Sequence, residues 1–180
     1  ISAMVEVSPA VNRIDISKNK IGDEAAQVFF EALRGTKIET LVIAEIQIGP
    51  ASLTSFANVI SDMPALSEVN LSMNKCFNSD SAKAFADVIL TSKIQTLVIG
   101  PKATVAPVHG SDATALDLSD RNLGPSELIV ISSAISVMAA LTAMNVMKNP
   151  IGEDGLEALM STIKGTRVKT ICDRIEGQTS

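Results

Sequence analysis

The sequence predicts an α/β solenoid, a horseshoe with parallel strands on its concave face and helices on its convex face. The first observation behind this prediction is a short apolar segment that recurs along the 180 residues. Its copies begin at Ile14, Leu41, Val69, Leu97, Leu116, Met144 and Ile171. Five of the six steps between copies span 27 or 28 residues, and the step from Leu97 to Leu116 spans 19. Because a fixed period of this length is typical of stacked units, we expect about seven repeats of 27–28 residues with one short step.

Each repeat carries a strand pattern followed by a helix pattern. Apolar residues alternate with other residues in each copy, which predicts a strand with one buried face. After each glycine the apolar residues are spaced by three and four positions, which predicts a helix with one apolar stripe. The stripes that we expect are Ala25, Val28, Phe29, Ala32 and Leu33 in the first unit, Leu53, Phe56, Ala57 and Ile60 in the second, and Ala82, Phe85, Ala86 and Ile89 in the third.

Units of this kind have to stack, because one unit alone cannot bury both its strand face and its helix stripe. Parallel strands lie about 4.8 Å apart whereas packed helices need about 8–10 Å, so the stack curves with the strands inside. The ends of the predicted helices agree with this division. Pro50 and Pro125 suit first turns, and Gly35 and Gly165 suit the ends of helices.

The segment Ile14-Asp15-Ile16-Ser17-Lys18-Asn19-Lys20-Ile21-Gly22 and its counterpart from Met144 to Gly152 resemble the ribonuclease-inhibitor type of leucine-rich repeat. This type occurs also in NOD-like receptors, Ran GTPase-activating protein and the actin regulators of the tropomodulin and CARMIL groups. Proteins with this scaffold share little else, so the resemblance implies a fold and leaves the function open.

The asparagine that bonds the turn backbone in such repeats is present in only some units of this chain. The positions that keep it are Asn19, Asn74 and Asn149, and those that replace it are Ile46, Lys102, Arg121 and Glu176. We therefore expect a weaker ladder of asparagine hydrogen bonds.

The short step is the irregular part of the repeat. Residues Gly100 to Ala113 include Pro101, Pro107 and Gly110 and lack helical spacing, so we expect an extended or looped segment that crosses the outer side. We interpret it as a short repeat without a helix. An inserted loop within one long repeat is the alternative.

Length and repeat pattern together indicate one leucine-rich-repeat domain over residues 1–180. Solenoids normally need polar terminal caps, and both ends of this pattern look open. We therefore expect a fragment of a longer chain, or ends that associate with one another.

Charge and composition exclude several partners. Fifteen Lys and Arg stand against twenty Asp and Glu, giving a net charge of −5 with no basic run of the kind that follows a phosphate backbone, so we expect no nucleic-acid partner. No apolar stretch approaches the roughly 20 residues of a membrane helix, so we expect no membrane partner. Cys76 and Cys172 lie far apart without metal or redox spacing, which suits a reducing compartment, so we expect a cytoplasmic location.

Few residues suggest catalysis. His109, Ser111 and Asp112 supply the residue types of a nucleophilic triad, but geometry defines a triad, and we interpret them as part of a solvent-facing loop. Arg121 could stabilise charge in a nucleotide hydrolysis partner, although a displaced turn residue is the favoured interpretation. Cys76 falls at a core position. We expect no enzyme activity, no metal site and no cofactor.

The predicted binding surface is the concave face, where residues between the buried strand positions point. Its candidate residues are Arg13, Asp15, Ser17, Thr40, Val42, Glu68, Asn70, Ser72, Asp117, Ser119, Asn145, Met147 and Arg174. A broad, shallow, mildly acidic surface suits a protein or peptide more than a small molecule, which needs an enclosed pocket. The sequence therefore predicts a scaffold for protein–protein interaction. The resemblance leaves a GTPase-activating or cytoskeletal regulatory domain as an alternative, and a structural spacer is a further one.

Overall fold

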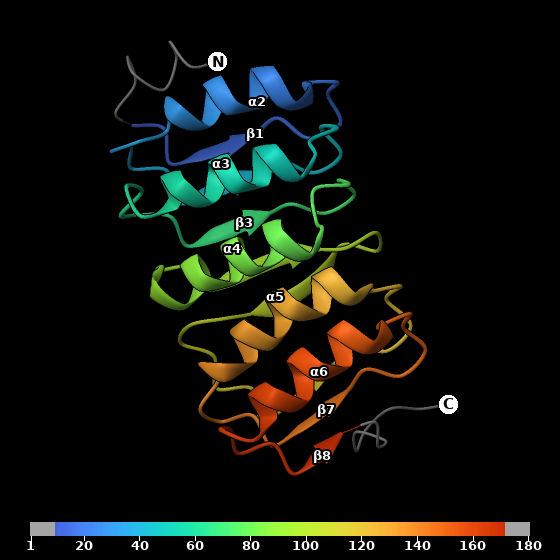
Figure 1. Ribbon diagram of the computed structural model, residues 1–180. Helices are drawn as coiled ribbons and strands as arrows, with labels where there is room; N and C mark the ends of the chain where they lie inside the picture. Colours follow the sequence, from blue (N-terminus) through green and yellow to red (C-terminus); the bar gives the residue numbers. More distant parts are fainter. Residues whose placement is uncertain (1–9, 172–180) are drawn as a thin grey trace.

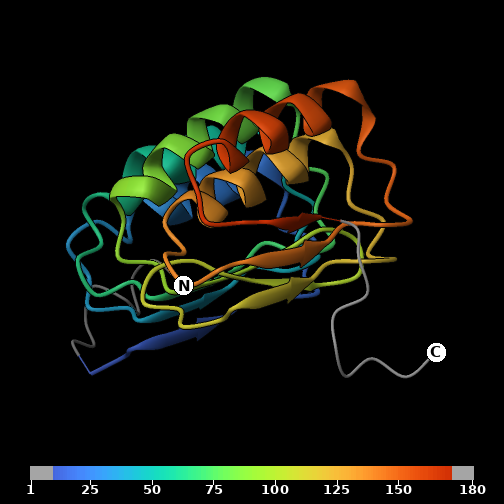
Figure 2. The ribbon, with the colours of Figure 1, turned by 90° about the horizontal axis from the view of Figure 1, so that it is seen from below.

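The computed structural model describes residues 10–171, which form a strand layer and a helix layer (Figures 1 and 2). The strands are β1 (Arg13–Asp15), β2 (Thr40–Val42), β3 (Glu68–Asn70), β4 (Thr96–Ile99), β5 (Thr104–Pro107), β6 (Ala115–Asp117), β7 (Ala143–Asn145) and β8 (Thr170–Ile171). The helices are α2 (Gly22–Glu31), α3 (Pro50–Ile60), α4 (Ser79–Thr91), α5 (Pro125–Ser136) and α6 (Gly152–Ile163). Strand–helix units follow one another from the N-terminal to the C-terminal end of the molecule, with all helices on one side of the strands.

The repeat markers pair with one another across the strands. In the first sheet Ile14 pairs with Leu41, Leu41 with Val69 and Val69 with Leu97, all in parallel register. In the second sheet Leu116, Met144 and Ile171 pair in the same way. Each step of 27 or 28 residues therefore equals one parallel strand-to-strand step, as the alternation in the sequence predicts.

The short step is a β-hairpin, which corrects the expected uniform row of parallel strands. β5 pairs antiparallel with β4, with Ile99 opposite Thr104 and Thr96 opposite Pro107. Four residues separate these strands, and a connection this short can join antiparallel strands but not parallel ones. The residues after Gly100 therefore return through the strand layer and do not cross the outer side. β5 ends a five-stranded sheet, and β6 begins a separate three-stranded sheet.

The helix layer continues where the strand layer is divided. α4 packs against α5, and α5 packs against α6. Contacts across the hairpin join the two sheets: the Lys102 ammonium donates to the Asp120 carbonyl oxygen at 2.7 Å and lies 3.0 Å from the Asp120 carboxylate. Gly100 lies so close to Leu123 that an added Cβ would approach the Leu123 Cδ2 to 2.9 Å. The chain therefore keeps one helix layer over two sheets.

The core lies between the two layers and runs from repeat to repeat. Phe30, Phe56 and Phe85 are fully buried on successive helices, with ring centroids 4.8 Å apart for the first pair and 6.2 Å apart for the second. Aromatic rings at these separations contact one another directly. The core of one unit is thus completed by the side chains of its neighbours.

The apolar stripes of α3 and α4 are buried as predicted, whereas the stripe predicted for α2 is confirmed only at Phe29 and Leu33. Ala26, Phe29, Phe30 and Leu33 are buried, whereas Ala25 is exposed and Val28 is 68% exposed. Both sets follow a helical period, so spacing could not choose between them. The buried set includes Phe30, whose side chain is larger than that of Val28 and whose ring packs on Phe56.

Asparagines bond the turns of neighbouring repeats as well as their own. The Asn74 side chain donates to the Ile43 carbonyl at 2.7 Å and accepts from the Ile46 N–H at 2.9 Å. Asn149 likewise accepts from the Arg121 N–H at 3.0 Å. Ile46 and Arg121 are the positions where asparagine is replaced, so the unit that follows each of them supplies the missing hydrogen-bond partner.

We predict that Asn74→Ala lowers the free energy of unfolding by about 1–3 kcal/mol, because its loss leaves backbone groups of two repeats without their partner. Chemical denaturation measures the change. Asn58→Ala, at an exposed position on α3, is the control and should change the free energy by no more than about 0.5 kcal/mol. Equal effects of the two substitutions would contradict the role of Asn74 between repeats.

Candidate partner-binding face

The strand face, defined here as the side of the strands that faces away from the helices, carries two rows of side chains. Alternate residues of a strand point to the same face, and the marker residues point into the core. Strand register aligns Asp15, Val42, Asn70, Val98 and Val105 in one row, and Arg13, Thr40, Glu68, Thr96 and Pro107 in the next. In the second sheet Asp117 aligns with Asn145. Most of the predicted binding residues therefore lie on one face.

These residues differ in how much surface they offer. Arg13 and Asp15 are exposed, and Met147 is 48% exposed. Val42, Ser72 and Asn145 are buried, at 8%, 2% and 7% exposure, so they offer little side-chain surface to a partner. Thr40, Glu68, Asn70, Ser17, Asp117 and Ser119 are half-buried. Arg174 and Cys172 lie outside the described residues.

Four of the predicted binding residues form turns at the ends of strands. In each turn a side-chain oxygen accepts a hydrogen bond of 3.0 Å from the backbone N–H two residues later. The acceptor and donor residues are Asp15 and Ser17, Asn70 and Ser72, Asp117 and Ser119, and Asn145 and Met147. Asp and Asn favour turns for this reason. The recurrence of Asp or Asn at this position is thus explained by the turn itself.

A left-handed residue completes each of these turns. The residues with positive φ at the matching position are Lys18, Met73, Asp120 and Lys148, with φ between 53° and 60°. The N–H of Lys18 donates to Ala44, that of Met73 to Gly100 and that of Asp120 to Met147, always to a carbonyl of the adjacent strand segment. Turn and strand pairing therefore support each other.

One of these turns holds a charged side chain of the strand face by hydrogen bonds. The Ser17 hydroxyl and N–H donate to the Asp15 carboxylate and lower the pKa of that carboxyl, and Arg13 at 3.7 Å lowers it further. Glu68 accepts a long hydrogen bond of 3.5 Å from Thr40. Within residues 10–171, the strand face thus carries the Asp15 carboxylate, which is held by Ser17 and lies next to Arg13, and the Glu68 carboxylate beside Thr40.

Two residues of this face, Pro107 and Val105, were not predicted from the sequence, and Val105 is the more exposed of the two. It lies opposite Val98 across the hairpin and is 56% exposed. Sequence reasoning placed residues 100–113 outside the strand layer, so Val105 was not assigned to the face. The alternation of Thr104, Val105 and Ala106 was a weak signal for a strand.

A hollow of about 660 Å³ opens at the loops that follow the strands, next to the hairpin. Its apolar lining includes Met73, Phe77, Pro101 and Pro150, and charged groups border it at Glu45, Lys75 and Glu127. Met73 is 51% exposed. This arrangement adds accessible apolar surface at the edge of the strand face, from repeats that are distant in sequence.

The residues that suggested catalysis have structural partners. His109, Ser111 and Asp112 lie in a loop after β5, as expected; Asp112 is exposed, whereas His109 is half-buried and its Nε2 donates to the Ile89 carbonyl near the end of α4 at 3.0 Å. The Ser111 hydroxyl accepts from the Ala113 N–H. Arg121 occupies the turn position bonded by Asn149, as its interpretation as a displaced turn residue predicts. Cys76 is buried, as expected, and burial raises the pKa of its thiol to about 12.

Within residues 10–171, no group of three or more His, Cys, Asp or Glu side chains is arranged to hold a metal ion. None of the helices described here is long and apolar enough to cross a membrane.

Comparisons with known proteins agree with this geometry. A family model described as a leucine-rich repeat matches residues 8–30 and 140–160, which include the units of Asn19 and Asn149. The fold is also similar to a solved structure titled "Leiomodin-1 Actin-Binding Site 2 (ABS2)", with a TM-score of 0.57 over 91% of this chain and 86% of that chain, at 11% sequence identity. Both matches support a leucine-rich repeat protein. No curated protein sequence matches the chain.

We predict that Ser17→Ala raises the pKa of Asp15 toward the ordinary value for an aspartate. The variant loses the hydroxyl donor and keeps the backbone N–H donor, so the rise should be partial. Titration of the side-chain carboxyl signals by NMR measures it. Asp23, which is held by Gly49 and Ser52, should titrate as in the unmodified chain. An unchanged Asp15 pKa would contradict the turn geometry.

Proposed function

We propose that the chain is a leucine-rich-repeat solenoid of the ribonuclease-inhibitor-like type, a horseshoe of about seven repeats in one domain, which binds a protein or peptide through its concave face. The supporting observation is the row of aligned side chains that runs through five strands, from Asp15 on β1 to the exposed Val105 on β5. Leucine-rich repeats generally mediate protein–protein interaction. The proposed role is non-enzymatic and cytoplasmic.

The contact surface that we propose includes fewer residues than the sequence predicted. Residues that hold turns are needed for folding, whereas Arg13, Glu68, Val105 and Met147 have side chains that remain accessible in part. An apolar centre with a charged border is the usual arrangement of a protein interface. Val105 and Met147 supply apolar contact, and Arg13 and Glu68 supply charge.

The test of this proposal compares two substitutions on opposite layers. Val105→Asp places a charge on the strand face, and Val28→Asp places the same charge at the exposed surface of α2. Both residues are more than half exposed, so both variants should keep the thermal stability of the unmodified chain.

We expect Val105→Asp to weaken capture of a partner at least tenfold, which equals about 1.4 kcal/mol. Val28→Asp should have no effect. Affinity capture from a cell extract, followed by titration of the captured protein, measures both. If Val28→Asp abolishes capture and Val105→Asp does not, the partner site lies on the helix layer. If neither variant changes capture, the strand face is not the binding surface.

Actin is the first defined probe, because the structural neighbour is titled as an actin-binding site. A cytoskeletal regulatory role is therefore the second candidate function. Co-sedimentation with filaments and titration with monomeric actin test it directly. Absence of binding to both forms would remove this candidate and leave the general scaffold role in place.

A further inference from the structure

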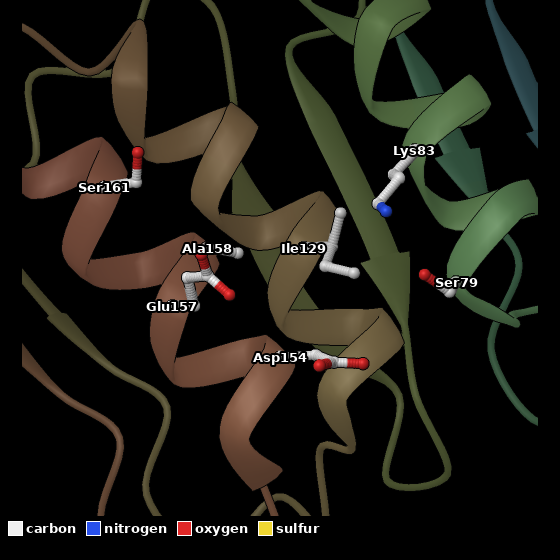
Figure 3. Close-up of a pocket in the computed structure, with 7 residues that line it drawn as sticks. All are labelled: Ser79, Lys83, Ile129, Asp154, Glu157, Ala158 and Ser161. Carbon is white, nitrogen blue, oxygen red and sulfur yellow. The ribbon is translucent and has the colours of Figure 1, made fainter.

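A second hollow lies on the opposite layer, over helix α5 and between α4 and α6 (Figure 3). Its volume is about 370 Å³. Ile129 of α5 lies at its centre, Lys83 lines it from α4, and Asp154 and Glu157 line it from α6. The hollow is therefore built from three repeats, on the helices that continue across the divided strand layer.

Side-chain size and helix packing create this space. α6 approaches α5 closely at Gly155, where an added Cβ would lie 3.0 Å from the Pro125 Cα and 3.2 Å from the Leu128 Cβ. Further along, α6 presents the small residues Ala158 and Ser161 to the hollow. Ala158 and Ser161 are thus too small to cover Ile129, which remains half-buried.

The charged side chains that the structure describes around the hollow carry both signs and form no ion pairs with one another. Figure 3 shows Lys83 directed from α4 toward Ile129, and Asp154 and Glu157 extending from α6 on the other side of Ile129. The ion pairs among the described residues are Arg13 with Asp15, Arg34 with Glu31, Arg34 with Asp62, and Lys102 with Asp120. None of them involves the three charged residues of the hollow.

A ligand that matches this arrangement carries charges of both signs. Enclosed small-molecule pockets are lined mainly by apolar groups, whereas this open hollow has two apolar residues, Ile129 and the small Ala158, among charged and hydroxyl-bearing side chains. A basic side chain can lay its aliphatic stem on Ile129 and direct its cation to Asp154 and Glu157. An acidic side chain nearby in the same ligand can reach Lys83.

We propose that this hollow binds a peptide segment of a partner protein that carries an acidic and a basic side chain close together in sequence. The basic side chain of the peptide would contact α6, and its acidic side chain would contact α4. Because the hollow and the strand face lie on opposite layers, the two sites can be occupied at the same time. The charge pattern gives the bound segment a defined orientation. This site is independent of the partner proposed for the strand face.

The test uses blocked peptides in which Glu and Arg are separated by zero, one, two or three alanines, with matching Gln peptides as uncharged controls. Exposed ion pairs are weak, so dissociation constants on the order of millimolar are expected for probes of this size. NMR shift changes at Lys83, Ile129 and Glu157 during titration measure binding, and added salt should weaken it.

The decisive variant is the double substitution Asp154→Asn and Glu157→Gln, which keeps shape and removes charge. We expect binding of the best Glu/Arg peptide to weaken at least fivefold, and Lys83→Gln to weaken it by a smaller factor. Asp87→Asn, at an exposed position of α4 that does not line the hollow, is the matched control and should leave binding unchanged.

Three outcomes would overturn the proposal. The first is the absence of shift changes at the hollow with every Glu/Arg peptide. The second is equal binding by the unmodified chain and the double variant, or by the Gln peptides. The third is a set of shift changes at the hollow that depends on protein concentration alone, which would assign it to a second copy of the chain.

Discussion

Side chains from several repeats together form the core between the strand layer and the helix layer, and the rest of the structure depends on this shared core. Phe30, Phe56 and Phe85 come from three successive helices and contact one another in line. The hydrogen bonds of Asn74 and Asn149 connect repeats in the same manner, since each asparagine bonds the backbone of the unit before it. Apolar burial and turn hydrogen bonding therefore act between the same neighbours, which keeps the strands and helices in step.

The hairpin of β4 and β5 changes one layer without interrupting the other. Helices α4, α5 and α6 stay in contact, whereas the strands divide into two sheets. Surface irregularities gather near this division. Val105 is exposed on the strand face, one hollow opens at the loops beside Pro101, and another lies above α5. A regular repeat array offers similar surface at every unit, so a local break in the repeat is where a distinctive surface can form.

In a repeat protein, a polar residue that recurs for structural reasons is easily mistaken for a binding residue. Asp15, Asn70, Asp117 and Asn145 recur at one strand position, and each accepts the backbone N–H two residues later. A polar residue that recurs in this way is explained by the turn it forms. The residues that remain as candidates for partner contact differ from this pattern: Val105 lies on the hairpin, and Met147 has an apolar side chain at a turn position that is serine in the three other turns.

The sequence by itself determined the strand positions other than β5, the parallel pairing at steps of 27–28 residues, the buried stripes of α3 and α4, and the core position of Cys76, because these follow from periodicity along the chain. Only the tertiary structure decided that β5 returns antiparallel, that Phe30 and not Val28 is buried, and that His109 bonds the Ile89 carbonyl near the end of α4. The same holds for the meeting of Lys83 with Asp154 and Glu157 around Ile129. Each of these depends on which repeats become neighbours and how closely their side chains pack, and a pattern read within one repeat does not contain that information.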